Sequence, residues 1–97
     1  MLERKFQADL ISELKETFPG CYILKNDANY IQGFPDLLIL FNNSWAALEV
    51  KNSPNAHLQP NQKYYLTRLD EMSYAALVYP ENKDDVMNGL REHFRYW

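Results

Sequence analysis

Apolar residues recur every three or four positions in three stretches of the chain, a spacing typical of helices that bury one face. The stretches cover residues 2–18, 60–69 and 83–95. Pro19 and Gly20 end the first stretch, because proline cannot continue a helix and glycine favours a helix end. The inward side of the first predicted helix consists of Leu2, Phe6, Leu10, Ile11, Leu14 and Phe18.

Four shorter apolar runs have the length of strands. They cover residues 21–25, 35–41, 45–51 and 74–79. The turn residues Asn42, Asn43 and Ser44 separate the second and third runs, which predicts an antiparallel hairpin. A predicted helix separates the third and fourth, so these strands should be parallel through a βαβ crossover. The predicted order is α-β-β-β-α-β-α: an α/β fold with a small mixed sheet flanked by helices.

Composition and charge describe one ordinary globular domain that spans residues 1–97. Hydrophobic residues make up 46% and charged residues 24% of the chain. Cys21 is the only cysteine, so an internal disulfide is impossible and an intracellular setting is expected. The charged N-terminus does not resemble a signal peptide, and no apolar run is long enough to span a membrane. A net charge of −3 counts against a nonspecific nucleic-acid coat protein but leaves room for an enzyme whose carboxylates hold a cation.

The predicted hairpin brings charged residues to one corner of the sheet. Asp36 begins the second strand, and Glu49 and Lys51 end the third, so these residues should lie opposite one another. Glu49 and Lys51 share a face because they are two positions apart, whereas Val50 points into the core. Two carboxylates on rigid strands suit Mg²⁺ or Mn²⁺. Water molecules and a phosphate would supply the remaining ligands of the ion. Lys51 could then orient the attacking water or stabilise charge on the phosphate.

This motif resembles that of the PD-(D/E)XK nuclease superfamily. The matching residues are Pro35-Asp36 followed by Glu49-Val50-Lys51. The resemblance implies a restriction-endonuclease-like core, with metal ligands from Asp36, Glu49 and the Val50 carbonyl. Lys51 would assist the attacking water. More narrowly, Gly33-Phe34-Pro35-Asp36, an early Glu and Gln62 resemble the virus-type replication-repair nuclease (VRR-NUC) branch and the Holliday-junction resolvases near it, over almost the whole chain.

Two helical residues extend the candidate site. On a helical wheel Glu3 falls within the apolar arc of the first helix, and a carboxylate that faces a core needs a reason. The resemblance to resolvases supplies one, since an early Glu completes the metal site there. Gln62 lies in the middle of the inward arc of the second helix, and the resemblance to VRR-NUC domains places it near the active site. Its amide could bind a water, a carboxylate or a phosphate.

Each of these residues also has a purely structural interpretation. Asp36 could shape the start of a strand, and Glu49 and Lys51 could be a solvated pair. Glu3 could be an exposed acid in the first helical turn, where the helix dipole favours it. Gln62 could be a satisfied buried amide. Weaker candidates for contact with DNA are Lys25, Asn26, Asp27, Asn29, Tyr30, Gln32, His57, Lys63 and Arg68.

The leading hypothesis is a metal-dependent DNA endonuclease, selective for branched or junction DNA. The catalytic core leaves little of the 97 residues for a separate DNA-reading module, so selectivity should come from loops or from a homodimer with two sites. The small size and the resemblance suggest a phage or another mobile element as the source. The competing hypothesis is a noncatalytic DNA- or protein-binding module on the same fold. A hydrolase of another class ranks last, because the sequence has no nucleophile elbow, zinc-ligand spacing or phosphate-binding loop.

Overall fold

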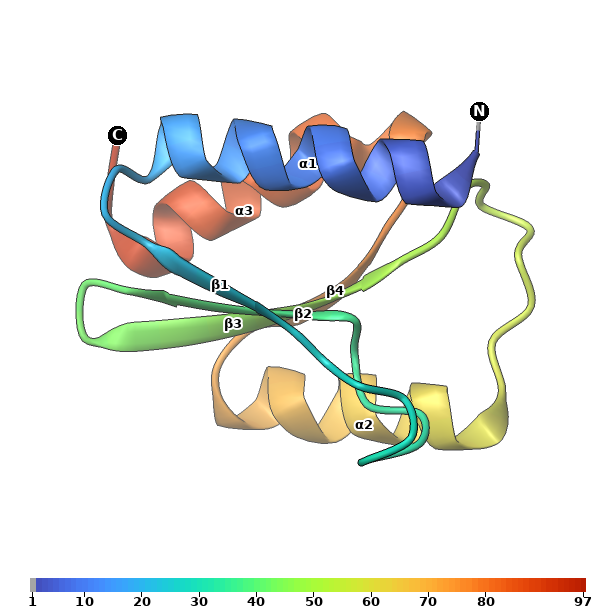
Figure 1. Cartoon of the computed structure of the whole chain (residues 1–97). Coiled ribbons are helices and arrows are strands. Elements are labelled where there is room, and N and C mark those ends of the chain that lie inside the picture. Colours follow the sequence, from blue (N-terminus) through green and yellow to red (C-terminus); the bar gives the residue numbers. More distant parts are fainter. Residues whose placement is uncertain (1) are drawn as a thin grey trace.

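The structure, a computed structural model, describes residues 2–97. Its elements follow the predicted order with small shifts at their ends (Figure 1). They are α1 (Glu3–Thr17), β1 (Tyr22–Lys25), β2 (Leu37–Phe41), β3 (Ser44–Val50), α2 (Pro60–Met72), β4 (Ala75–Val78), the short 3-10 helix η1 (Pro80–Asn82) and α3 (Lys83–Phe94). The α/β class and the order of elements are therefore confirmed, while η1 was not expected.

The strands form a four-stranded sheet in the order β1-β2-β3-β4. The β2–β3 hairpin is antiparallel and the β3–β4 pair is parallel, as predicted, and β1 adds an antiparallel edge to β2. Helices α1 and α3 cover one face of the sheet and α2 covers the other (Figure 1). Among the described residues no helix combines the length and apolar character needed to cross a bilayer.

The hairpin turn explains why β2 and β3 pair in register. Asn42 and Asn43 connect the strands with φ values of 51° and 63°. A two-residue turn with positive φ at both positions matches the twist of the strands, and asparagine tolerates this conformation better than most residues. Phe41 consequently pairs with Ser44, and Leu37 with Leu48. This register determines which residues meet at the far end of the hairpin.

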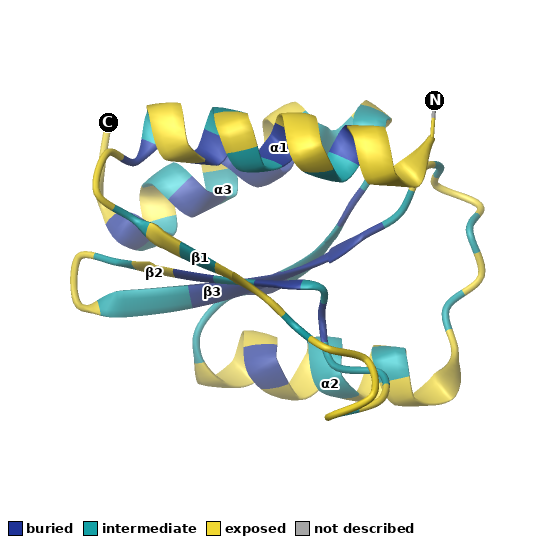
Figure 2. Ribbon diagram, in the orientation of Figure 1, coloured by how far each residue is buried: buried dark blue, intermediate teal, exposed yellow. Residues whose placement is uncertain are grey.

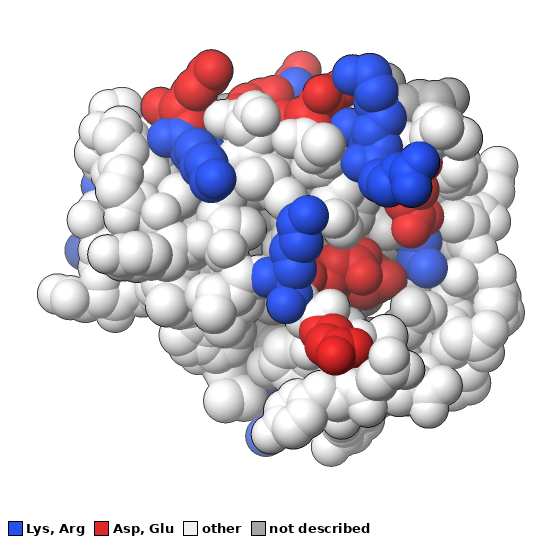
Figure 3. All heavy atoms as spheres, in the orientation of Figure 1, with Lys and Arg blue, Asp and Glu red and all other residues white. Residues whose placement is uncertain are grey.

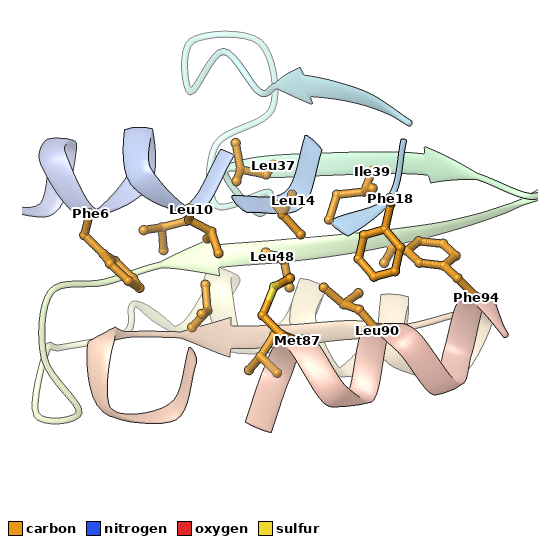
Figure 4. Packing of buried hydrophobic residues seen from close by; sticks show 14 residues of the cluster. Phe6, Leu10, Leu14, Phe18, Leu37, Ile39, Leu48, Met87, Leu90 and Phe94 are labelled. Atoms are coloured by element: carbon orange, nitrogen blue, oxygen red, sulfur yellow. The ribbon is translucent and has the colours of Figure 1, made fainter. Parts of the chain in front are cut away.

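The main core lies between the sheet and helices α1 and α3. Figure 4 shows its side chains, which converge from α1, α3 and the inner face of β2 and β3. Leu37 and Ile39 point into it from alternate positions of β2, and Leu48 and Val50 from β3, all fully buried. A much smaller buried cluster lies on the α2 side and consists of Ala47, Leu69 and Ala75. Figure 2 shows the contrast, since most of α2 is exposed or only partly buried.

Candidate active site

The paired ends of β2 and β3 bring Asp36 next to the end of β3. Asp36 directly precedes β2, and the Leu37–Leu48 register places it opposite Glu49. The backbone N–H of Val50 donates a 2.8 Å hydrogen bond to Asp36 Oδ2. A carboxylate that accepts a bond from the opposing strand is held in one place, so the Asp36 side chain is rigidly positioned rather than mobile.

Glu49 is the one buried charged residue of the described chain, with 3% of its surface exposed. It lies on the α2 face, because its neighbours Leu48 and Val50 point into the main core. Lys51 Nζ lies 3.5 Å from Glu49 Oε2, and Gln62 Nε2 donates a 3.0 Å hydrogen bond to the same oxygen. The structure therefore brings Asp36, Glu49, Lys51 and Gln62 together at one end of the sheet.

The start of α2 holds Gln62 in its place. Pro60 occupies the first turn of this helix, and Gln62 Oε1 accepts a 2.8 Å hydrogen bond from the N–H of Gln59. One end of the amide thus caps the helix while the other end donates to Glu49. The capping partner was missed from the sequence, since glutamine is a rare residue at the position before a helix and serine, threonine, asparagine and aspartate are the usual signals.

Burial and like charge shape the electrostatics of this corner. The pKa of Glu49 is raised to about 7, first by removal from water and then by the charge of Asp36, while Lys51 opposes the shift. Removal from water also raises the pKa of Asp36, although the Val50 N–H and Lys51 partly counteract this. The site therefore holds two carboxylates that are costly to ionise together, and a bound cation would favour the charged form of both.

The sequence predicted that Glu3 completes the site, but the structure does not group its side chain with Asp36 and Glu49. Its side chain is exposed in the first turn of α1, and among the described residues no three histidine, cysteine or acidic side chains are grouped to hold a metal. The expectation that Glu3 faces the core was wrong, because α1 begins at this residue and the first core residue is Phe6. The exposed first-turn interpretation fits the structure. Because this turn lies at the same end of the molecule as the end of β3 (Figure 1), a metal-ligand role for Glu3 stays a prediction.

Charged side chains around the site are mixed in sign. Figure 3 shows acidic and basic atoms side by side around a hollow between the α1 layer and the α2 layer. Lys25 ends β1 and Lys63 lies in α2, both exposed, whereas Arg68 is paired with Glu71 at 3.3 Å. Arg68 is therefore a weaker candidate for a phosphate contact than the two lysines, and His57 lies exposed in the loop before α2.

Comparisons with known proteins support the fold. No model of a known protein family and no curated protein sequence matches the chain. A solved structure described as a VRR_NUC domain protein matches with a TM-score of 0.72 and 20% sequence identity, over 98% of this chain and 89% of the other. This chain therefore shares the fold of that VRR_NUC domain protein, which confirms the restriction-endonuclease-like fold expected from the resemblance.

Proposed function

We propose that the protein is a divalent-metal-dependent endonuclease that hydrolyses DNA phosphodiester bonds at the corner formed by Asp36, Glu49, Lys51 and Gln62. The observation that carries this proposal is the burial of Glu49, only 3% exposed, opposite a second carboxylate at the end of a strand pair. A structural ion pair would not need Asp36 beside Glu49, because the nearby negative charge makes ionisation of Glu49 harder.

The oxygen donors of the site fit Mg²⁺ or Mn²⁺. Asp36 and Glu49 would hold the ion, with the Val50 carbonyl and Glu3 as further candidate ligands. When bound, such an ion supplies Lewis acidity toward the scissile phosphate and lowers the pKa of water. Carboxylate oxygens are hard ligands of the kind that these ions prefer. The pKa of each carboxyl group is raised, so a cation would relieve the cost of holding both in the charged form.

The protein side chains then divide the remaining work. Lys51 carries an ammonium group to the edge of the site, where it orients the attacking water or stabilises charge that develops on the phosphate. Gln62 holds one oxygen of Glu49 by its N–H, so the carboxylate keeps a single orientation. Hydrolysis proceeds by direct attack: the water oxygen forms a bond to phosphorus as the bond to the leaving sugar oxygen breaks.

Selectivity for branched or junction DNA and a homodimer are further parts of the proposal. The open edge of β1 supports a dimer, because Tyr22 is 72% and Leu24 is 49% exposed on a strand that pairs with β2 on one side only. Two copies joined by a two-fold axis would present two sites to two strands. Sedimentation at micromolar concentration tests this part, and a strict monomer would weaken the case for junction DNA.

Cleavage of labelled DNA tests the proposal. Linear duplex, single strand, splayed arm and four-way junction are incubated with Mg²⁺, Mn²⁺ or EDTA, using wild type, Asp36→Ala and Glu49→Gln. Asp9→Asn serves as the matched control, since its exposed carboxylate pairs only with Lys5 on the surface of α1. We expect metal-dependent cutting by wild type and Asp9→Asn, and none by the two site variants.

The alternative is a noncatalytic binding module on the same fold. One observation favours it: Lys51 and Gln62 both act on Glu49 Oε2, so the carboxylate has partners without a metal. DNA binding with no cleavage of any substrate, and with Asp36→Ala binding as wild type does, would support the module over the enzyme.

A further inference from the structure

The loop between β1 and β2, residues 26–34, carries the most exposed large hydrophobic side chain of the described residues. Tyr30 is 82% exposed near the middle of this loop. A tyrosine left in water at this position gains no packing energy, although aromatic rings contribute strongly when they are buried. Its ring is therefore free to contact a partner of the protein.

Hydrogen bonds within the loop hold Tyr30 on a fixed support. The Tyr30 N–H donates to the Asp27 carbonyl at 2.9 Å, and the Asn29 N–H donates to Asp27 Oδ1 at 2.8 Å. The side chain of Asn26 spans the loop and donates to the carbonyl oxygens of Ile31 and Phe34 at 3.2 Å and 3.5 Å. A segment that satisfies its own backbone groups in this way loses little conformational entropy when it binds a partner.

The same loop is attached to α2. Asn61 Nδ2 donates a 3.3 Å hydrogen bond to the Gln32 carbonyl, and the rings of Phe34 and Tyr65 lie 5.4 Å apart. Gly33 has a φ of 87°, and a Cβ atom at this position would lie 2.5 Å from Asn61 Cγ. Only glycine allows this close approach, so the loop and the start of α2, which also carries Gln62, form one unit.

The two ends of the loop meet at Asp36, a residue of the candidate active site. The Asn26 N–H donates to the Asp36 carbonyl at 2.9 Å, so the loop closes on the residue that supplies a carboxylate. Tyr30 is four residues from Asn26, which limits the distance between its Cα and that of Asp36 to about 20 Å. At 3.4 Å per nucleotide, the ring can reach DNA within roughly five or six nucleotides of the scissile phosphate.

We infer that Tyr30 is a stacking residue that binds an unpaired base of the DNA substrate close to the point of cleavage. This inference rests on the proposed function and gives a physical basis for selection of branched DNA. Bases inside a duplex already stack on both sides, whereas an unpaired base presents a free face to an aromatic ring. Lys25 directly precedes the loop and is an exposed cation that could contact a neighbouring phosphate.

Binding to a fluorescent splayed-arm DNA tests the inference. The probe carries 2-aminopurine in its unpaired arm next to the branch, and binding is measured in EDTA so that no cleavage occurs. We expect quenching of the probe by wild type and by Tyr30→Phe, which keeps the ring. Tyr30→Leu should lose the quenching and bind the splayed arm roughly 5- to 150-fold more weakly, the range for loss of one base stack, with duplex affinity unchanged.

Trp97→Leu is the matched control, because it removes a ring that is 79% exposed at the C-terminal residue, outside the loop and outside the candidate active site. Equal affinity and quenching in wild type and Tyr30→Leu would overturn the inference, as would wild type that binds duplex as tightly as the splayed arm. Since the assay needs neither metal nor cleavage, it remains decisive even where the proposed nuclease activity fails. Unchanged thermal unfolding of Tyr30→Leu verifies that the loop is intact.

Discussion

The two faces of the sheet differ in what they bury. The face under α1 and α3 buries a continuous set of aliphatic and aromatic side chains from both helices, β2, β3 and β4. The α2 face buries three small or medium residues, Ala47, Leu69 and Ala75, together with the charged Glu49. It also leaves an open apolar hollow of about 330 Å³ lined by Phe34, Leu38, Leu40, Trp45, Leu69 and Met72.

This difference shows how a small domain can separate stability from chemistry. Burial of apolar area is the main favourable term in folding, so the α1 and α3 face supplies most of the stability. The α2 face can therefore accept the cost of a buried carboxylate, since its partner Lys51 directly follows β3, which the other face anchors, and its partner Gln62 is fixed at the start of α2 by the cap with Gln59. Changes on the two faces should consequently affect different measurements.

The largest expected effect compares neighbouring leucines of β2 that point to opposite faces. Leu37 is fully buried in the main core, whereas Leu38 is only partly buried on the α2 face. Leu37→Ala should lower the free energy of unfolding by about 3–5 kcal/mol because it leaves a cavity in a close-packed core. Leu38→Ala should cost less than about 2 kcal/mol, since exposed apolar area contributes little. Urea unfolding measures both, and equal losses would contradict the division between the faces.

The next largest effect is a change on the α2 face that lowers activity and leaves stability unchanged. Lys51→Met removes the ammonium group but keeps most of the side-chain length, so the carboxylates stay in place while charge stabilisation of the phosphate is lost. We expect cleavage to fall by about 10²–10³-fold with the fold retained, the range for loss of one stabilising donor. Lys15→Met, an exposed lysine in the last turn of α1, is the control and should remain active. A Lys51→Met variant with full cleavage activity would remove this residue from the mechanism.

A third effect is the pH dependence of stability. In the folded protein the pKa of Glu49 is about 7 against an ordinary 4.5, so the folded state keeps its proton after the unfolded state has lost it. The free energy of unfolding should therefore fall as pH rises from about 4.5 to about 7, by up to roughly 3 kcal/mol. Glu49→Gln should flatten this fall, as measured by urea unfolding in EDTA at several pH values.

Metal provides the control for the pH experiment. At pH 8 the carboxylate of Glu49 is above its pKa of about 7 and is charged, so added Mg²⁺ should raise the melting temperature by binding only the folded state. Glu49→Gln should show no such gain. A slope that persists in Glu49→Gln would assign the pH dependence to other groups, Asp36 first among them because burial raises its pKa too.

Periodicity was sufficient to predict the elements, because each helix and strand has one face that must be apolar. The register of the hairpin followed from Asn42 and Asn43, and the register in turn placed Asp36 opposite Glu49. The same logic identified Gln62, a polar residue in an inward arc that proves to bond Glu49. The predictions of elements and of hairpin register succeeded because each depended on contacts within one element or one hairpin.

Predictions failed where tertiary position decides the environment of a residue. A helical wheel assigns Glu3 to the apolar arc, yet it carries no information on where the helix meets its neighbours, and this turn extends beyond the core. The pairing of β1 with β2 was not predicted, since the loop of residues 26–34 contains no tight-turn signal. The role of Asn26, which ties that loop to the Asp36 carbonyl through its backbone and to Ile31 through its side chain, likewise depends on contacts formed only after folding.

The smallest expected effect tests whether Gln62 orients Glu49 or merely caps α2. Gln62→Ala removes both the bond to Glu49 Oε2 and the acceptor for the Gln59 N–H. We expect Mg²⁺ affinity to fall by about 10–100-fold, as is typical when a group that positions a metal ligand is removed. The pH midpoint of Mg²⁺ binding should also move upward, because loss of a donor to the charged form raises the pKa of Glu49 further. Gln59→Ala keeps its backbone N–H and the Gln62–Glu49 bond, so it should change neither value. Loss of helix stability with an unchanged midpoint in Gln62→Ala would mean that the amide serves the fold alone, and the chemistry of the α2 face would then rest on Asp36, Glu49 and Lys51.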